Sequence, residues 1–220
     1  MIVDVKSPVT LVGGGYFGAE ILNEVLRLAP NLVAADGGAN AAVAEGHIPL
    51  AVIGDFDSLG RAARDAIPAE RLHQIADQDS TDFQKVMERV RAPYVLAIGF
   101  TGSRVDHELA VYASIINPEF CPCIVIGERD IVFAAPLAIS LDLELGTRVS
   151  LFPMASVTGR SVGLRWPIEG LEFAPWSRLG TSNAATYRTV QLEFDRQGML
   201  VILPRKCLKA VIAGFSSLEY

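Results

Sequence analysis

The sequence predicts an α/β fold, with an N-terminal open, mainly parallel β/α sheet domain followed by a smaller C-terminal antiparallel β-sandwich domain. Up to about residue 126, short runs that are apolar on both faces alternate with stretches of helical apolar spacing. From residue 131 onward the apolar segments are short, several alternate apolar with polar residues, and Gly or Pro separates them. We therefore expect two domains, residues 1–132 and 133–220.

Composition and charge limit the classes of protein that fit. The 220 residues are 50% hydrophobic, which is enough to bury a substantial core. The net charge of −6, with no basic run to offset it, argues against nucleic acid or an anionic membrane as partner. No apolar run reaches membrane-spanning length, the N-terminus lacks a basic and apolar leader pattern, and three cysteines form no C-x-x-C pair. We expect a cytoplasmic protein.

The first β/α element carries a glycine loop. A strand at 9–12 leads into Gly13–Gly18, and helical apolar spacing follows over 17–28. The loop reads G-x-G-x-x-G, and Asp36 follows the next strand, 32–35, where a nicotinamide-binding fold places its ribose-binding acid. The same loop geometry serves any anion that needs backbone N–H donors. After Asp36, the residues 37–40 predict a tight turn that approaches a ligand.

Two carboxylates follow the next buried strand. The run 50–53 is apolar on both faces, and Asp55 and Asp57 stand where it leaves the sheet. Alternate residues of an extended segment point the same way, so both carboxylates are expected to aim at one Mg²⁺ ion. The alternative interpretation is an ordinary turn followed by a helix cap.

A second acidic segment, 77–85, follows a predicted strand at 71–76. Thr81 and Gln84 fit a capping box, which places Asp82 in a first helical turn and Lys85 three residues later. The alternative here is a capped helix with a surface ion pair. After the strand 94–98, glycines, Arg104, Asp106 and His107 precede a helix at 108–116. Arg104 is suited to forked hydrogen bonds with phosphate, whereas His107 taken singly fits a cap or packing role.

The second half has two loops of unusual content, 163–167 and 177–183. Their Ser and Asn side chains offer hydrogen bonds from tight turns, and Trp166 offers an aromatic face. Taken singly, a turn and a core tryptophan explain them equally well.

These separate clusters are expected to lie together, because the carboxyl ends of parallel strands meet at one edge of a sheet. Five carboxylates with two cations suit a metal–polyphosphate complex, in which acids hold Mg²⁺ while cations and loop N–H groups hold phosphate. The residues expected at this edge are Asp36, Asp55, Asp57, Asp82, Asp106, Arg104 and Lys85.

In order and spacing, the motifs resemble the thiamin pyrophosphokinase family. They are Ala35-Asp-Gly-Gly-Ala-Asn40, Gly54-Asp-Phe-Asp-Ser58, the segment 77–85, Gly102-Ser-Arg-Val-Asp-His107, Gly163-Leu-Arg-Trp166 and Ser177-x-x-Gly180-x-Ser182-Asn183. The resemblance implies an ATP:thiamin diphosphotransferase that works as a homodimer, with ATP and Mg²⁺ on the α/β domain and thiamin between that domain and the partner's β domain.

The same resemblance implies roles for individual residues. Metal ligands would be Asp55, Asp57 and Asp82, and these three with Asp106 form the expected catalytic set. Asp82 or Asp106 would orient or deprotonate the thiamin hydroxyl, and Asp106 with Arg104 would serve the nucleotide phosphates. The full nucleotide-binding set is Asp36, Gly37, Gly38, Asn40, Lys85, Gly102, Arg104 and His107. The thiamin-binding set is Gln78, Thr181, Ser182, Asn183 and Trp166.

Two positions depart from the family pattern, and three other functions stay open. Ser103 stands where the family has a second glycine, and Val111 where many members have asparagine. A nicotinamide-dependent oxidoreductase would explain the glycine loop and Asp36 but not the other acids. A diphosphokinase for another hydroxymethyl heterocycle, such as a pterin, would share the ATP half. A non-catalytic nucleotide or thiamin sensor would bind both ligands without releasing AMP.

Overall fold

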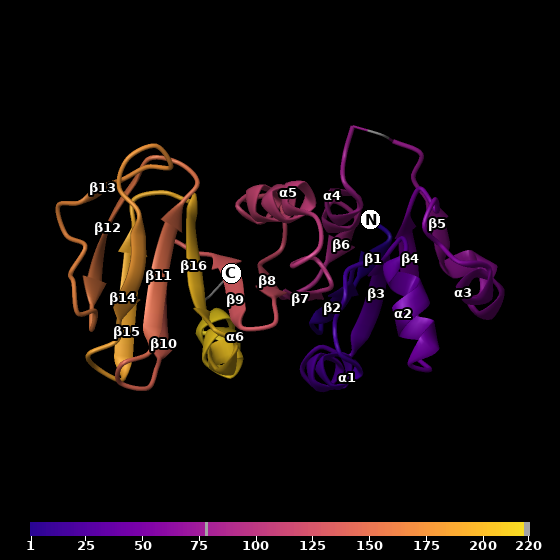
Figure 1. The fold of residues 1–220 in the computed structure, drawn as a ribbon, viewed down its shortest axis with the longest axis horizontal. Helices are drawn as coiled ribbons and strands as arrows, with labels where there is room; N and C mark the ends of the chain where they lie inside the picture. The colour runs from indigo at the N-terminus through magenta and orange to yellow at the C-terminus, as the bar shows by residue number, and fades with distance from the viewer. Residues whose placement is uncertain (78, 218–220) are drawn as a thin grey trace. The chain divides into compact units, whose positions relative to one another are not determined.

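The computed structural model describes residues 1–77 and 79–217. The chain forms two compact units, an α/β unit of residues 1–127 and a β unit that begins at Glu128 (Figure 1). This division falls before the expected boundary at residue 132, because strand β9 (Asp130–Ala134) pairs with β16 (Met199–Pro204) of the β unit. The change from β/α alternation to antiparallel β is confirmed.

The α/β unit is built on six parallel strands whose chain order reverses at one point. Its strands lie in the order β8-β7-β2-β3-β4-β5, so the chain runs outward from β2 in one direction and then continues from β7 in the other. Ligands bind outside the carboxyl ends of such strands at this switch point. The strands are β2 (Val9–Val12), β3 (Asn31–Ala35), β4 (Ala51–Gly54), β5 (Leu72–Gln74), β7 (Val95–Ile98) and β8 (Cys123–Ile126).

Helices join these strands, and the central strands are buried along their full length. α2 packs against β2 and β3, and α4 packs against β3 and β4. A separate pair of short parallel strands, β1 (Val3–Asp4) and β6 (Val90–Arg91), ties the start of the chain to the segment after α4. The helices are α1 (Ala19–Leu28), α2 (Gly38–Ala44), α3 (Arg61–Ala66), the 3-10 turn η1 (Ala69–Arg71), α4 (Asp82–Met87) and α5 (Val105–Ile115).

The β unit contains two antiparallel sheets, in the orders β14-β11-β16-β9 and β10-β15-β12-β13. The alternation in β10 and β15 turns one face of the second sheet inward and the other to solvent. The remaining bounds are β10 (Ala138–Asp142), β11 (Arg148–Pro153), β12 (Val157–Val162), β13 (Glu172–Phe173), β14 (Gly180–Ala184) and β15 (Thr189–Phe194).

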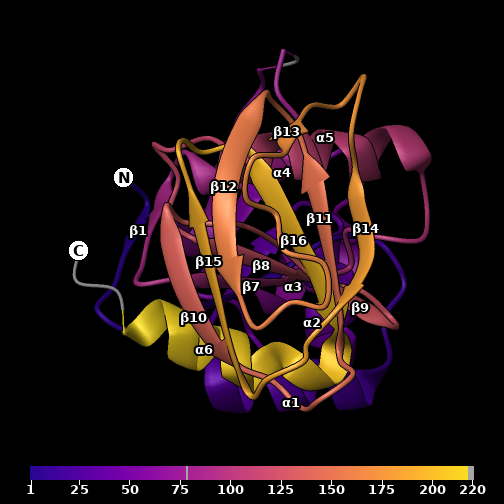
Figure 2. The same ribbon diagram turned by 90° about the vertical axis from the view of Figure 1, so that its left-hand side faces the viewer.

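A C-terminal helix, α6 (Leu208–Ser216), follows the 3-10 turn η2 (Arg205–Cys207) and contacts a strand of each sheet (Figure 2). Phe215 packs edge-on against Phe133 of β9, with ring centroids 5.4 Å apart. Gly214 lies so close to Leu141 of β10 that an added Cβ would meet that side chain at 3.1 Å. The helix therefore adds apolar surface to the core shared by the two sheets.

Several elements of the described chain differ from the sequence prediction, including the short strands β1, β6 and β13, which were not predicted. The segment after Asp36 is not only a turn, because α2 begins at Gly38 and its alanines favour helix. The loop expected over 177–183 ends in strand β14, which is polar in sequence and is held by pairing with β11. β9 and α6 were also not predicted, and β9 crosses the expected domain boundary. Among the described residues, no helix is long and apolar enough to span a membrane.

Candidate active site

The turn after β4 presents two of the predicted carboxylates. Asp55 and Asp57 do not alternate along an extended segment as expected, because Phe56 adopts a left-handed conformation with φ of 69°. Its ring packs against the apolar cluster between β4 and α3, while the backbone N–H of Asp57 donates to Asp55 Oδ1 at 3.2 Å. A non-glycine residue with positive φ is uncommon and concentrates at functional sites. The turn, rather than strand alternation, brings the two acids together.

Asp36 follows β3 and is buried beside this turn, with a side chain only 2% exposed. Its Oδ2 accepts a hydrogen bond from the backbone N–H of Ser58 at 3.0 Å, whereas its Oδ1 has no hydrogen-bond partner among the described residues. Burial raises the pKa of Asp36 from its ordinary 3.8 to about 6; the nearby Asp57 and Asp82 add to this rise, and the Ser58 N–H opposes it. A buried carboxylate with an unpaired oxygen calls for a positive partner.

Asp36, Asp55 and Asp57 form one group of oxygen ligands. One carboxylate oxygen from each lies within 4.8 Å of the others. Carboxylate oxygens are the ligands that a hard cation such as Mg²⁺ prefers, and such a cation would offset the repulsion among three acids. The donor set and the unpaired Asp36 oxygen therefore fit a divalent metal. The sequence placed Asp36 at this edge and assigned it to nucleotide binding; the structure adds that its carboxylate lies within the same group as Asp55 and Asp57.

Asp82, the other predicted metal ligand, is held by Lys85. Thr81 and Gln84 form the predicted capping box at the start of α4, which fixes Asp82 in the first turn. Lys85 is 2% exposed, and its Nζ lies 3.0 Å from Asp55 Oδ2 and 3.1 Å from Asp82 Oδ1. Burial would lower the pKa of Lys85, but these two carboxylates outweigh it and raise the pKa. The lysine of this pair is therefore buried while Asp82 is partly exposed, so the pair is not the surface ion pair considered from the sequence.

A cavity of about 380 Å³ lies at the switch point, next to this acidic group. Its size is in the range of small-molecule binding sites. Its walls combine the glycine loop after β2, the ends of β3 and β7, and the first turns of α4 and α5. The described lining includes twelve polar or glycine positions, Gly14, Gly15, Asp36, Gly37, Asn40, Ser58, Thr81, Asp82, Gly99, Ser103, Arg104 and His107, and four apolar ones, Ala35, Phe83, Phe100 and Val111.

Glycines let the backbone walls of this cavity approach one another. The loops after β2 and β7 touch directly, since the N–H of Gly15 donates to the carbonyl of Gly99 at 2.8 Å. An added Cβ at Gly38 would lie 2.2 Å from the carbonyl oxygen of Val12, so the start of α2 tolerates no side chain there. Gly38 thus supports the site, and Gly37 lines it.

Asn40, predicted to bind nucleotide, serves the loop after β4. Its Nδ2 donates to the carbonyl of Ser58 at 2.8 Å, and its Oδ1 accepts from the N–H of Gly60 at 2.8 Å. Both ends of the amide are therefore occupied by backbone, which holds the Asp55–Ser58 turn in place. Asn40 also lines the cavity, so contact with a ligand stays a prediction.

Arg104 and Asp106 form an exposed forked pair at the start of α5. Arg104 Nη2 lies 2.6 Å from Asp106 Oδ2, and Arg104 Nε lies 3.2 Å from Asp106 Oδ1. The guanidinium lowers the pKa of Asp106 to about 2. Of the three residues of the nucleotide-binding set in this segment, Arg104 and His107 line the cavity, while the N–H of Gly102 donates to Glu108 Oε2 at 2.9 Å.

In the β unit, Asn183 and Trp166 are linked by hydrogen bonds. Asn183 is buried; its Oδ1 accepts from the N–H of Trp166 at 3.1 Å, and its Nδ2 donates to the Trp166 carbonyl at 2.7 Å. The amide therefore holds the 163–166 loop against β14. The Trp166 ring is 55% exposed, with the Arg165 guanidinium 5.0 Å from its centroid, so it is not a core tryptophan.

Thr181 and Ser182 lie exposed on β14, where its register with β11 shifts. Ser182 has φ of 64°, and its N–H donates to Ser150 Oγ at 3.0 Å. Such an irregularity re-aims side chains relative to a regular strand. Gln78, the remaining predicted thiamin ligand, lies outside the described residues.

The geometry does not favour a nicotinamide site. Asp36 would have to turn its carboxylate to a ribose, yet its Oδ2 is bonded to Ser58 and its carboxylate belongs to the acidic group after β4. The glycine loop instead lines a cavity together with Asp82 and Arg104.

Three solved structures show how widely this fold is shared. Thiamin pyrophosphokinase from Candida albicans matches with a TM-score of 0.77 at 15% identity, over 90% of this chain and 89% of that one. Yeast thiamin pyrophosphokinase gives a TM-score of 0.77 at 14% identity, over 98% and 90%. Thiamine pyrophosphokinase from Bacillus subtilis gives a TM-score of 0.69 at 19% identity, over 90% of this chain and 98% of that one. At these identities the likeness concerns the fold, and no curated protein matches the sequence.

The sequence itself carries a family match. Residues 22–125 match the family described as thiamin pyrophosphokinase, catalytic domain. The matched segment contains the acidic group, Lys85 and the Arg104–Asp106 pair, whereas Trp166 and β14 lie outside it. Residues 22–125 of this chain are therefore similar to the catalytic domain of the thiamin pyrophosphokinase family, and its fold is shared with solved structures of that name.

Proposed function

We propose that this protein transfers the β,γ-diphosphate unit of ATP to the hydroxyl of thiamin, giving thiamin diphosphate and AMP. The observation that carries the proposal is the position of the acidic group beside a cavity of about 380 Å³, inside the segment that matches the family. A group of carboxylates next to a glycine-lined cavity suits a metal–polyphosphate substrate.

In this proposal the α/β unit binds ATP and Mg²⁺. Asp55 and Asp57 hold the metal, and Asp36 is the third carboxylate of the group; Asp82 as a direct ligand stays a prediction. Bound Mg²⁺ neutralises charge on phosphate oxygens around the phosphorus that is attacked. Arg104 exchanges its exposed partner Asp106 for phosphate oxygens, and the backbone around Gly14 and Gly37 approaches the nucleotide closely.

The chain's own residues also position the acceptor. The thiamin hydroxyl attacks the β-phosphorus of ATP, a new P–O bond forms, and AMP leaves with the bridging oxygen. Asp82 or Asp106 orients this hydroxyl or accepts its proton, while alignment and charge neutralisation supply most of the rate. The β unit supplies the thiamin-binding groups Trp166, Thr181 and Ser182, and Asn183 holds the loop that carries Trp166. We further propose that two copies of the chain form the active homodimer.

The test is a product assay with matched omissions. The protein is incubated with ATP, Mg²⁺ and thiamin, and AMP, ADP and thiamin diphosphate are measured together by chromatography and mass spectrometry. We expect AMP and thiamin diphosphate in equal amounts, with neither formed when EDTA replaces Mg²⁺. ADP in place of AMP, or product only with a hydroxymethylpterin, would refute the assignment. Light scattering during size-exclusion chromatography tests the homodimer.

A further inference from the structure

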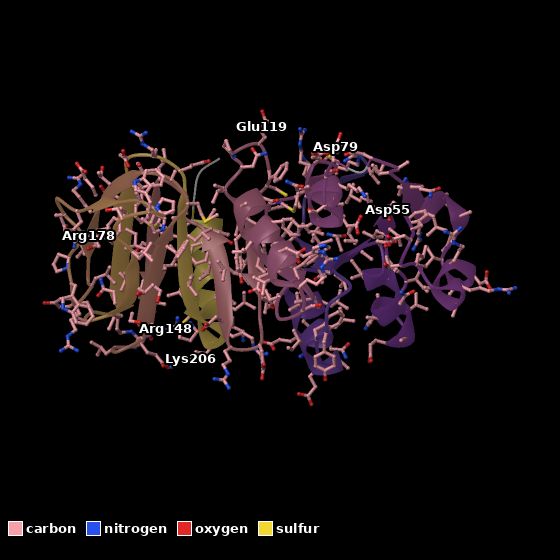
Figure 3. The ribbon with its side chains drawn as sticks, turned by 45° about the horizontal axis from the view of Figure 1, so that its top comes forward. Asp55, Asp79, Glu119, Arg148, Arg178 and Lys206 are labelled. Carbon is pink, nitrogen blue, oxygen red and sulfur yellow. The ribbon has the colours of Figure 1, made fainter. Side chains whose placement is uncertain are left out.

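The ammonium group of Lys85 connects the turn after β4 to helix α4. Lys85 lies on α4 and contacts Asp82 on its own helix and Asp55 after β4, at 3.1 and 3.0 Å. The side chain of Lys85 is 2% exposed, against 20% for Asp55 and 36% for Asp82 (Asp55 is labelled in Figure 3). The cation is therefore the most deeply buried member of the three.

Lys85 is fixed by its surroundings as well as by its charge. Its neighbours on α4, Phe83, Val86 and Met87, are buried, and the helix begins at a complete capping box. A buried lysine is stable only when its charge is paired. The Lys85 ammonium directs N–H groups at two carboxylates, and Lys85 is not among the described residues that line the cavity. These contacts favour a role with the carboxylates, and nucleotide binding by Lys85 stays a prediction.

Asp55 belongs both to the ion pair with Lys85 and to the acidic group with Asp36 and Asp57. Its Oδ2 accepts from Lys85, its Oδ1 accepts from the N–H of Asp57, and one of its oxygens also falls in the group with Asp36 and Asp57. Hydrogen bonds to both oxygens fix the plane of a carboxylate, and such supporting contacts orient metal ligands. The same positive charge, close to the group, also opposes the binding of a second cation.

We propose that Lys85 is a positioning residue, which fixes Asp55 and Asp82 and limits the negative charge of the acidic group, and that it does not contact the phosphates. This inference rests on the proposed function for its kinetic consequence, but its effect on metal affinity is independent of thiamin. This role explains why the lysine of α4 is buried, since an ion pair on the surface would stabilise the start of the helix equally well.

The experiment measures Mn²⁺ binding by electron paramagnetic resonance in the absence of nucleotide, and thiamin diphosphate formation separately. Lys85→Met should bind Mn²⁺ at least tenfold more tightly, because the loss of a repelling charge outweighs the lost support for Asp55. The kcat should fall at least a hundredfold, because Asp55 and Asp82 are no longer held in place. Lys85→Arg keeps the charge and should bind Mn²⁺ within threefold of the wild type. Lys206→Met is the matched control, since Lys206 pairs with Glu144 on the surface of the β unit (Figure 3); neither quantity should change.

A second background keeps the test decisive if Lys85→Met does not fold. Asp82→Asn should weaken Mn²⁺ binding at least tenfold, and adding Lys85→Met to it should restore the affinity to within threefold of the wild type. Unchanged Mn²⁺ affinity in both comparisons, together with a raised KM for ATP, would overturn the proposal and make Lys85 a phosphate ligand. If the wild type makes no thiamin diphosphate, the proposed function fails while the Mn²⁺ comparisons still decide the role of Lys85.

Discussion

The α/β unit and the β unit use their polar side chains in opposite ways. In the α/β unit, Asp36 and Lys85 are buried, and their charged groups lie among carboxylates at the ends of two strands and a helix. In the β unit, Thr181, Ser182 and Trp166 are exposed, and the buried Asn183 bonds to the backbone. Charge in the acidic group is thus buried within the folded α/β unit, whereas three of the residues predicted to bind thiamin are exposed on the β unit. This contrast predicts which substitutions affect turnover, stability or substrate affinity.

The largest expected effect comes from removing a carboxylate of the acidic group. Asp57→Asn keeps a side-chain oxygen for the Ser58 hydroxyl, which donates to Asp57 Oδ1 at 2.7 Å, but removes one charge. We expect kcat to fall roughly 10³-fold, about 4 kcal/mol of transition-state stabilisation, with little change in unfolding free energy. Steady-state kinetics and urea unfolding measure the two quantities.

The matched change in the β unit is Asp142→Asn, since Asp142 is exposed and pairs with Arg188. It should leave turnover unchanged. Near-normal activity in Asp57→Asn would remove Asp57 from the site and abolish the contrast between the units.

The second effect is a dependence of stability on pH. The pKa of Asp36 is raised to about 6 in the folded protein from 3.8, so the folded state binds the proton more strongly. Asp36 therefore contributes most to stability below pH 3.8, and this contribution is lost as pH rises to 6, by about 3 kcal/mol. The measurement is the difference in unfolding free energy between the wild type and Asp36→Asn, at pH 3.5 and pH 7.5 without metal.

Two comparisons sharpen this prediction. Added Mg²⁺ should stabilise the wild type more than Asp36→Asn at pH 7.5, because it neutralises the buried carboxylate. In the β unit, Asp195 accepts from the N–H of Thr158, and this bond lowers its pKa. Asp195→Asn should therefore give a difference of opposite sign, with the native Asp more stabilising above pH 4. A difference for Asp36 that does not vary with pH would show that its burial does not oppose its charge.

Sequence reasoning located the acids of the α/β unit because strand ends can be found from apolar periodicity. The β/α alternation and the capping box at Thr81 placed Asp55, Asp57, Asp82 and Asp106 at strand-to-helix junctions. The left-handed conformation of Phe56 could not be predicted from an apolar run, and neither could the burial of Asp36, which was expected at this edge but not inside it. No sequence feature indicates that a lysine is buried, so Lys85 was assigned to phosphate binding.

The β unit was less predictable, because long-range pairing decides its structure. The polar sequence of β14 reads as a loop, and only pairing with β11 makes it a strand. For the same reason the sequence did not show that the Asn183 amide holds the loop of Trp166; its contact with thiamin stays a prediction. Exposure of Trp166 likewise follows from the position of that loop and not from the residue type.

The third effect is a loss of stability in the β unit without loss of nucleotide binding. Asn183→Ala leaves the N–H and carbonyl of Trp166 and the N–H of Ala184 without their present partners. We expect the unfolding free energy to fall by about 2 kcal/mol, with the KM for ATP unchanged. Urea unfolding with Thr181→Ala as an exposed control, expected within about 0.5 kcal/mol of the wild type, checks it. A raised KM for ATP in Asn183→Ala would contradict the division of roles between the units.

The smallest effect concerns substrate affinity. The exposed Trp166 ring is expected to pack against thiamin, so Trp166→Ala should raise the KM for thiamin about tenfold, which corresponds to about 1.4 kcal/mol of lost contact energy. The KM for ATP should stay within twofold, because nucleotide binding is assigned to the α/β unit. Trp176→Ala is the control, since Trp176 is also exposed on the β unit but was not assigned to thiamin. The opposite result, a raised KM for thiamin in Trp176→Ala and not in Trp166→Ala, would keep thiamin binding on the β unit. It would move the binding residues from the 163–166 loop to the segment before β14.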